Sequence, residues 1–357
     1  MPKKVLVAPL DWGLGHATRC IPVIQELIKQ GHEVLIAADD NVEHLLKEEF
    51  PELKFIYFRG YHVSYSSRLP AWFKILIQLP KILIRIIAEH RQLKKIIREH
   101  KIDVVISDNR FGLWNQNIKS IYITHQLMIK CPNEFKLFEP LLYRLHQIII
   151  NRYDLCWIPD FEGENNLTGD LSHKYTKPTN AKFIGSLSRL KYVDSVATMK
   201  YDLCFIISGP EPARSEFQKI VFEKLKSYSG KVVVILGNPK SSNHYSENNI
   251  EVFPYLNANQ LKDIIAKSKL IVCRSGYSSI MDLVALKKDA LLVATPGQTE
   301  QEYLAEYLDE KKIFKRILQS EMNIEMLNRD KNFSVNNFKV YLPDLLQEEI
   351  NKINSYE

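Results

Sequence analysis

The stretch that decides the fold reads Arg274-Ser-Gly-Tyr-Ser-Ser-Ile-Met-Asp282. It follows an apolar, strand-like segment at residues 269–273 and leads into a helical pattern at residues 280–287. A turn of small residues between a strand and a helix leaves backbone N–H groups at the helix N-terminus, where phosphate binds well. Arg274 adds forked donors, and Asp282 can reach a group one unit away from the phosphate. The stretch fits a diphosphate with an attached ribose, although an ordinary serine-capped turn explains it equally well on its own.

The same order of patterns appears twice along the chain. The first half opens with a strand at residues 4–10, a glycine-containing turn, a helix from about residue 17 to 30 and another strand at 32–37. Strand patterns of the second half lie at residues 203–207, 231–236, 250–253, 270–273 and 290–294. Alternating strands and helices indicate a parallel sheet covered on both faces. We therefore expect an α/β protein of two doubly wound, Rossmann-like domains facing across a cleft.

Length and composition are those of an ordinary globular protein. The 357 residues exceed a single core, so we expect an N-terminal domain at 1–188, a C-terminal domain at 189–335 and a helical tail at 336–357. The five cysteines are scattered without a CxxC pair, which disfavours a zinc site and suits a reducing compartment. No apolar run reaches the roughly 20 residues that span a bilayer, and the N-terminus shows no secretory signal. We expect a cytoplasmic location, with attachment to the inner face of the membrane as an option.

A second informative turn, Asp11-Trp-Gly-Leu-Gly-His-Ala-Thr-Arg19, follows the first strand. Its two glycines are only weak evidence for dinucleotide binding, because Thr18 stands where that fingerprint has a third glycine. His16 lies where the turn meets the helix, and an imidazole there can act as a general base or simply cap or pack the helix. Asp108 follows the apolar strand at 103–107 and can orient that imidazole or serve as a turn residue.

The two turns together resemble the GT-B glycosyltransferases. The segments that carry this resemblance are Gly13-Leu-Gly-His-Ala-Thr-Arg19 and Cys273-Arg-Ser-Gly-Tyr-Ser-Ser-Ile-Met-Asp282. They are most similar to family 28, the group typified by the peptidoglycan GlcNAc transferase that acts on a lipid-linked precursor. The basic residue followed eight positions later by an acid also resembles the donor signature of UDP-glucuronosyl and plant glucosyl transferases. Residues 295–303 are similar to the second donor element, and the resemblance covers both domain starts and most of residues 250–310.

The resemblance implies which residues bind the donor. Those at the diphosphate are Ser275, Gly276, Ser278 and Ser279, with Arg274 as their charge partner. Those on the rest of the donor are Asp282 at the ribose, Glu300 and Gln301 at the sugar, and Phe253 near the nucleobase. The family needs no metal and no cofactor, because N–H groups and an arginine stabilise the leaving diphosphate.

The resemblance also implies which residues serve the acceptor. It makes His16, oriented by Asp108, the base that deprotonates the acceptor hydroxyl. The acceptor or phosphate loops are assigned to Gly13, Gly15, Arg19 and Gly209. The chain departs from the family at Ser208-Gly-Pro-Glu211, where a turn richer in glycine is usual, so the assignment of Gly209 is the weaker one.

The positive charge of the chain is concentrated in residues 68–101. This segment carries nine Lys or Arg against two Glu, a net charge of +7, whereas the whole chain carries +6. Residues 71–98 fit a basic amphipathic helix with Trp72 and Phe73 at one end, which suits an anionic membrane surface. The alternative is a core helix with a solvated basic face. Nucleic acid is not expected, because no aromatic platform or recognition motif accompanies the charge.

Taken together, the patterns favour a glycosyltransferase that moves a hexosyl or N-acetylhexosaminyl group from a nucleotide-diphosphate sugar to an acceptor hydroxyl. UDP is the expected nucleotide, and a lipid-linked or membrane-exposed acceptor is one option. The alternative is a hydrolase of the same fold in which His16 activates water, because the turn through Cys20 also resembles nucleotide-sugar hydrolases of nonulosonic acid synthesis. A third possibility is a nucleotide-sugar-binding protein without catalysis.

Overall fold

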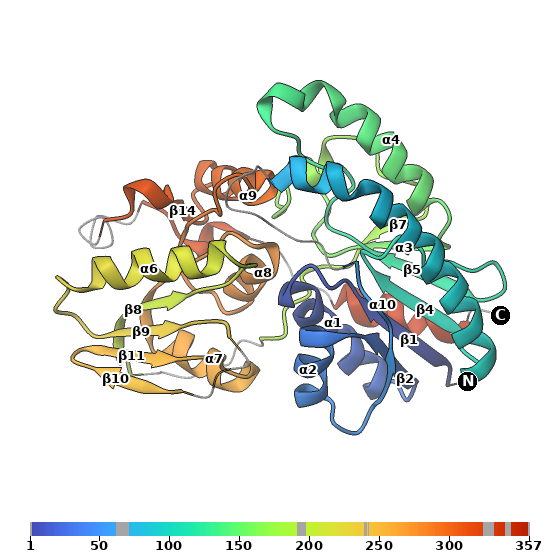
Figure 1. Cartoon of the computed structure of the whole chain (residues 1–357), viewed down its shortest axis with the longest axis horizontal. Coiled ribbons are helices and arrows are strands. Elements are labelled where there is room, and N and C mark those ends of the chain that lie inside the picture. The colour runs from blue at the N-terminus through green and yellow to red at the C-terminus, as the bar shows by residue number, and fades with distance from the viewer. Residues whose placement is uncertain are drawn as a thin grey trace. The chain divides into compact units, whose positions relative to one another are not determined.

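The computed structural model describes residues 2–61, 71–190, 198–238, 241, 243–323, 332–339 and 344–355, except for the side chains of residues 41, 71–76 and 355. The chain divides into two compact units. Unit 1 comprises Met1–Ser64, Trp72–Leu187 and Val340–Glu357, and unit 2 comprises Tyr65–Ala71 and Ser188–Lys339. In each unit a twisted sheet lies between helices (Figure 1).

Unit 1 is built on a seven-stranded parallel sheet in the order β3-β2-β1-β4-β5-β6-β7. Its strands are β1 (Lys4–Pro9), β2 (Glu33–Ala38), β3 (Lys54–Tyr57), β4 (Val104–Asp108), β5 (Lys119–Ile123), β6 (Leu155–Ile158) and β7 (Ala181–Phe183). The strand order reverses between β1 and β4, and the register pairs Pro9 with Asp108 at the carboxyl ends of these two strands. Doubly wound sheets bind their ligands at such a switch point.

The helices of unit 1 bury apolar stripes on this sheet. They are α1 (Leu14–Lys29), α2 (Asp40–Glu49), α3 (Ala71–His100), α4 (Glu139–Ile150), α5 (Asp170–His173) and α10 (Leu345–Asn351), with 3-10 turns η1 (Asn133–Phe138) and η5 (Lys352–Ser355). The expected tail at 336–357 is not a separate element, because its described part from residue 344 onward joins unit 1. There the side-chain amide of Gln30 donates to the carbonyl of Gln347 at 3.3 Å, and Ile350 and Ile353 are fully buried.

Unit 2 repeats the order of six of these strands and adds a strand, β10, at one edge. Its order is β10-β11-β9-β8-β12-β13-β14, and all pairs are parallel except β10 with β11. The strands are β8 (Tyr201–Ile206), β9 (Val232–Ile235), β10 (Tyr245–Glu247), β11 (Ile250–Phe253), β12 (Ser268–Cys273), β13 (Ala290–Leu292) and β14 (Lys315–Arg316). The expectation of two doubly wound, Rossmann-like halves is confirmed. The antiparallel edge strand β10 departs from the all-parallel sheet that we expected.

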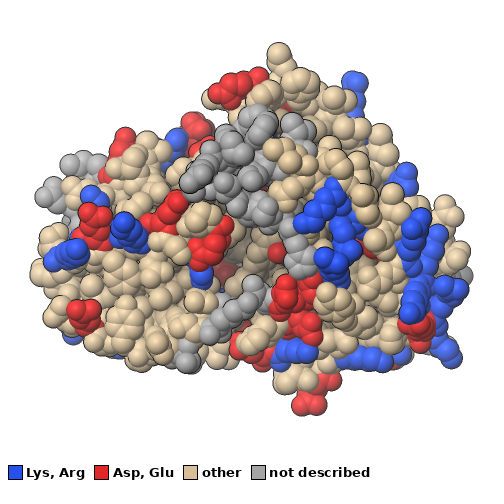
Figure 2. All heavy atoms as spheres, viewed as in Figure 1, with Lys and Arg blue, Asp and Glu red and all other residues tan. Residues whose placement is uncertain are grey.

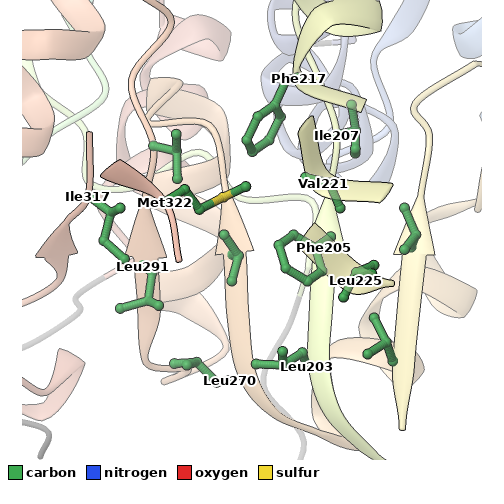
Figure 3. Close-up of a cluster of buried hydrophobic side chains, with 14 of the residues drawn as sticks. Leu203, Phe205, Ile207, Phe217, Val221, Leu225, Leu270, Leu291, Ile317 and Met322 are labelled. Atoms are coloured by element: carbon green, nitrogen blue, oxygen red, sulfur yellow. The ribbon is translucent and has the colours of Figure 1, made fainter. Parts of the chain in front are cut away.

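The hydrophobic core of unit 2 holds the central strands of its sheet, where the strand order reverses. The helices are α6 (Ala213–Leu225), α7 (Ala258–Ala266), α8 (Tyr277–Ala285) and α9 (Thr299–Glu310), with 3-10 turns η2 (Gln319–Glu321) and η4 (Val335–Asn337). Alternate residues of β8, among them Phe205, point to one sheet face and pack against Phe217 and Val221 of α6 (Figure 3). β8 and β12 are neighbours in the centre of the sheet, so the turns that follow them start from a buried, rigid base.

Candidate functional site

The first candidate site lies at the carboxyl ends of β1 and β4 in unit 1. Helix α1 begins at Leu14, earlier than the sequence indicated, with Gly13 as its N-cap at φ 146° and ψ 162°. Only glycine adopts that backbone conformation without strain, which explains a glycine between strand and helix. His16 therefore lies in the first turn of α1, at the edge of the sheet where Asp108 ends β4.

Four side chains form a buried polar cluster at this edge. Nδ1 of His16 lies 3.1 Å from Oδ2 of Asp108 and 2.9 Å from an NH2 nitrogen of Arg19. Nε of Arg19 lies 2.9 Å from both carboxylate oxygens of Asp108, and its NH1 nitrogen lies 2.9 Å from Nδ1 of His125. Asp108 is fully buried and the Arg19 side chain is 2% exposed, whereas that of His16 is 18% exposed. The structure thus brings His16 and Asp108 together, as the sequence suggested.

The cluster lowers the pKa values of both His16 and Asp108. Burial is the main cause that lowers the pKa of His16; Arg19 lowers it further, and Asp108 opposes both. Burial alone would raise the pKa of Asp108, but Arg19 and His16 outweigh it and the pKa of this carboxyl is lowered. Near neutral pH the site therefore combines a charged carboxylate with an uncharged imidazole, which is the state that a general base requires.

Arg19 does not lie where we expected it. We assigned it to an acceptor or phosphate loop, but its guanidinium points into the cluster with Asp108 and His125. Gly13 and Gly15 do flank the start of α1. Gly209, at φ 110°, lies in the loop after β8 and so belongs to unit 2.

The second candidate site is the start of α8 in unit 2, after β12. The helix begins at Tyr277 with Gly276 as its N-cap, and among the described residues no side chain caps it through a hydrogen bond. A Cβ built on Gly276 would meet no atom within 4 Å, so the space beside this backbone is open. Ser278 and Ser279 lie half-buried in the first turn. An open, glycine-capped helix start suits a phosphate group.

Arg274 and Ser275 are buried beneath this turn. Arg274 is 1% exposed, and its guanidinium donates to the carbonyls of Ala294 and Ala213 at 3.0 and 3.2 Å and lies 4.0 Å from the ring centroid of Phe217. Burial lowers the pKa of Arg274 to about 10. The Ser275 hydroxyl donates to the carbonyl of Gln301 at 2.8 Å. The expected contacts of these two side chains with a diphosphate are therefore corrected: both hold the turn in place from below.

Asp282 occupies the second turn of α8 and accepts a hydrogen bond of 2.6 Å from the hydroxyl of Ser188. Burial raises the pKa of Asp282 to about 6, although Arg189 and Ser188 oppose the shift. The residue as a whole is half-buried. This position is compatible with the ribose contact that the resemblance implied.

The remaining donor candidates divide into two kinds. Glu300 lies half-buried in the first turn of α9. Gln301 instead supports the loop before α9, since its side chain accepts from the Thr295 N–H at 2.9 Å and donates to Gln298 at 2.6 Å. Phe253 stacks on His244 with ring centroids 4.3 Å apart, so one face of its ring is already covered.

Sequence reasoning missed two residues of these sites. His125 is the second residue after β5, and polar residues close to the carboxyl end of a buried strand were a usable signal for it. Ser188 lies in the segment between the two halves of the chain, and no local pattern links it to Asp282, 94 positions away. Within the described part of the chain, no group of three or more His, Cys, Asp or Glu could hold a metal ion.

Helix α3 and the neighbouring α4 carry an unusual surface. The exposed large apolar side chains of α3 are Ile77, Leu79, Leu83, Ile84 and Ile87, and those of η1 and α4 are Leu137, Phe138, Leu141, Leu145 and Ile148. Phe111 links the two helices, because it packs against the buried cluster that contains Ile82 of α3 and its ring centroid lies 5.9 Å from that of His146 of α4. We call these ten residues the apolar surface.

Basic side chains accompany the apolar surface. Figure 2 shows blue Lys and Arg atoms gathered where α3 runs across unit 1. The exposed or half-exposed basic residues of α3 are Lys81, Arg85, Arg91, Lys94, Lys95 and Arg98. The second half of the helix is a core element, with Leu93 and Ile96 buried, so the core-helix alternative holds for that half. The side chains of Trp72 and Phe73 lie outside the described residues. No described helix is long and apolar enough to cross a membrane.

Two family models match the chain, one in each half. The glycosyltransferase family 28 C-terminal domain matches residues 204–336, which contain the α8 site. A glycosyl transferase family 1 model matches residues 4–125, which contain the His16 cluster. The first match contains the second half of β8 and all of β9 to β14, and the second contains β1 to β5, so each includes the switch point of one unit.

Similar proteins agree with these matches. An uncharacterized glycosyltransferase of Methanosarcina acetivorans is 22% identical over 86% of this chain and 84% of its own length. The Lactococcus lactis UDP-N-acetylglucosamine–N-acetylmuramyl-(pentapeptide) pyrophosphoryl-undecaprenol N-acetylglucosamine transferase is 28% identical over 38% of this chain and 34% of its own. The crystal structure of the Streptomyces glycosyltransferase SsfS6, complexed with thymidine diphosphate, superposes with a TM-score of 0.61 at 13% identity, covering 99% of this chain and 100% of that one. These findings identify the chain as a glycosyltransferase with the GT-B fold that resembles glycosyltransferase family 28.

Proposed function

We propose that the protein transfers a sugar from a UDP-sugar to an acceptor hydroxyl. The observation that carries the proposal is the open start of α8, with Gly276 as an N-cap and Asp282 one turn further along. The name of the Lactococcus relative specifies UDP-N-acetylglucosamine, and SsfS6 was crystallised with a nucleoside diphosphate, which supports this class of donor. A hexose or an N-acetylhexosamine is the sugar that the resemblance favours.

Donor binding is assigned to unit 2. The backbone at Gly276 and the hydroxyls of Ser278 and Ser279 bind the diphosphate, because the helix start supplies N–H donors and a positive dipole end. Asp282 accepts a hydrogen bond from a ribose hydroxyl, replacing the one it now receives from Ser188. Glu300 is assigned to the sugar hydroxyls. The Arg274 guanidinium stabilises this site only through the turn that it supports.

Proton removal is assigned to His16 in unit 1. The acceptor oxygen attacks the anomeric carbon, the bond from that carbon to the diphosphate breaks, and the acceptor proton passes to Nε2 of His16. Asp108 accepts the Nδ1–H of the ring and stabilises the imidazolium that forms. The diphosphate leaves with its bonding electrons, and the dipole and N–H groups of α8 stabilise the added charge without a metal ion.

A membrane-exposed acceptor is the option that the apolar surface supports. Ile84 and Leu137 are 66% and 92% exposed, and basic side chains of α3 are spaced along the same region. Apolar side chains that insert into a bilayer, flanked by Lys and Arg, give stable attachment to anionic lipid. We therefore propose that the enzyme is a peripheral protein of the inner face of a membrane.

Co-sedimentation with vesicles tests this part of the proposal. The protein should bind anionic vesicles more strongly than neutral ones, and Leu83→Asp with Ile84→Asp should reduce binding to both. Ile28→Asp is the matched control, since Ile28 is an exposed isoleucine of α1 outside the apolar surface. Equally weak binding of the unmodified protein to both kinds of vesicle would refute membrane attachment.

The reaction itself is tested by release of the nucleotide. The protein is incubated with UDP- and TDP-sugars, with and without hydroxyl acceptors that include lipid-linked sugars, and free nucleoside diphosphate is measured. We expect release that depends on an acceptor and on a UDP-sugar. Release at the same rate without acceptor would make the protein a hydrolase, and donor binding without release would make it a binding protein.

A further inference from the structure

Arg19 is the most constrained side chain of the His16 cluster, yet the proposed reaction gives it no task. Its guanidinium reaches Asp108 through Nε and NH2, His125 through NH1, and Nδ1 of His16 through NH2. A guanidinium always donates and stays charged in a protein. Nδ1 of His125 must therefore be an unprotonated acceptor, which fixes the tautomer of that ring and anchors Arg19.

Nδ1 of His16 has two possible partners that require opposite protonation. It can donate to Asp108 at 3.1 Å or accept from Arg19 at 2.9 Å. In the charged imidazolium Nδ1 carries a proton, so it can donate to Asp108 but cannot accept from Arg19. The positive ring then lies beside the positive guanidinium of Arg19. A buried carboxylate without Arg19 would hold the imidazolium, and a protonated ring cannot take a proton from an acceptor.

We propose that Arg19 is a positioning residue that neutralises Asp108 and thereby keeps His16 uncharged in the resting enzyme. The inference rests on the proposed role of His16 as the base. The groups of unit 1 that act on the His16 charge are Arg19 on the same helix, Asp108 at the end of β4 and His125 after β5. Arg19 and His125 lower the pKa of His16, as burial does, and Asp108 alone raises it. With Arg19 present, the Asp108 carboxylate orients the neutral His16 ring. Without Arg19, the same carboxylate would hold His16 in its protonated form.

The test is a titration of His16 by NMR with ¹⁵N-labelled histidine in the full chain, which reports the charge and the protonated nitrogen without turnover. Arg19→Met should move the midpoint of His16 upward by about one to three pH units, because a nearby cation is removed. The acidic limb of kcat/KM should move by the same amount. Arg19→Lys retains the charge and should restore most of the shift.

Two results would overturn the inference. The His16 midpoint could stay unchanged in Arg19→Met, or Arg19→Lys could shift it as far as Arg19→Met does. If Arg19→Met fails to fold because Asp108 is left unpaired, the double variant Arg19→Met with Asp108→Asn removes both charges. The His16 midpoint of this double variant should lack the upward shift of about one to three pH units, because the carboxylate that would hold the imidazolium is gone; an upward shift of that size would overturn the inference. A failed proposed function is recognised separately: His16→Ala would stay active, while Arg19→Met would still move the His16 midpoint in the chain that retains His16.

Discussion

The two helix starts of this protein have the same architecture and different chemistry. Both α1 and α8 begin after a central strand of a doubly wound sheet with a glycine N-cap, at Gly13 and at Gly276. At α1 the neighbouring charges are buried and paired, so that Arg19 and Asp108 neutralise one another around His16. At α8 the cation lies beneath the turn, and Asp282 is half-buried with a raised pKa.

The difference indicates a division of tasks. A buried cluster of paired charges controls where a proton resides, whereas an open backbone with a single acid binds a ligand. We therefore expect variants of the α1 site to change turnover and variants of the α8 site to change donor affinity.

The largest effect is expected for His16→Ala. Loss of a general base lowers kcat by about 10²–10⁴-fold, and UDP affinity should stay within twofold of the unmodified protein. His173→Ala is the matched control, because the His173 side chain is 19% exposed and lies 3.2 Å from Asp160, also in unit 1. Equal losses of UDP affinity and kcat in His16→Ala would remove the division between the two sites.

Asp282→Asn should have the next largest effect, on donor affinity. A hydrogen bond to a charged group contributes about 1.5–3 kcal/mol, so UDP should bind roughly 10- to 100-fold more weakly by calorimetry. At saturating donor, kcat should change little. Asp263→Asn on α7 is the control for the loss of one negative charge, since Asp263 is exposed and pairs only locally with Lys267. An unchanged UDP affinity in Asp282→Asn would refute the ribose assignment.

The two N-cap glycines should lose different amounts of stability when they are replaced by alanine. Gly13 has a backbone conformation that alanine adopts only with strain, so Gly13→Ala should lower the free energy of unfolding by about 1–3 kcal/mol. Gly276, at φ −70°, tolerates a Cβ in open space, so Gly276→Ala should cost about 1 kcal/mol or less in chemical denaturation. The same methyl group should nevertheless weaken UDP binding, because it occupies the proposed phosphate position. Equal losses of stability would show that the two caps are not different.

The smallest effect is expected from pH. With a pKa of about 6, the Asp282 carboxyl is protonated as pH falls through 6 and loses the charge that strengthens its hydrogen bond from a ribose hydroxyl. UDP affinity should therefore decline by about tenfold between pH 7 and pH 5, and Asp282→Asn should remove this decline. The folded state should not lose stability from this group over that range, because a raised pKa makes protonation favour the fold. If UDP affinity still declined between pH 7 and pH 5 in Asp282→Asn, the pH dependence would belong to another group.

The sequence allowed the fold and the two turns to be predicted, but not the direction of every side chain. Strand runs and glycine turns are local features, which is why β1, α1, β12 and α8 were recognisable. The short strands β7, β10 and β14 carry too few residues for a period to appear. Whether Arg19 or Arg274 faces a ligand or the core depends on carbonyls and carboxylates far along the chain. The bond from Ser188 to Asp282 is of the same long-range kind.

Hydrogen exchange of the full chain with and without UDP tests the division of tasks most directly. We predict slower exchange in peptides that contain Gly276 and the start of α8, and unchanged exchange in peptides of α1 around His16. TDP should give the same pattern with a smaller change if uracil is the preferred base. Protection at the start of α1 without protection at α8 would contradict the assignment of the donor to unit 2.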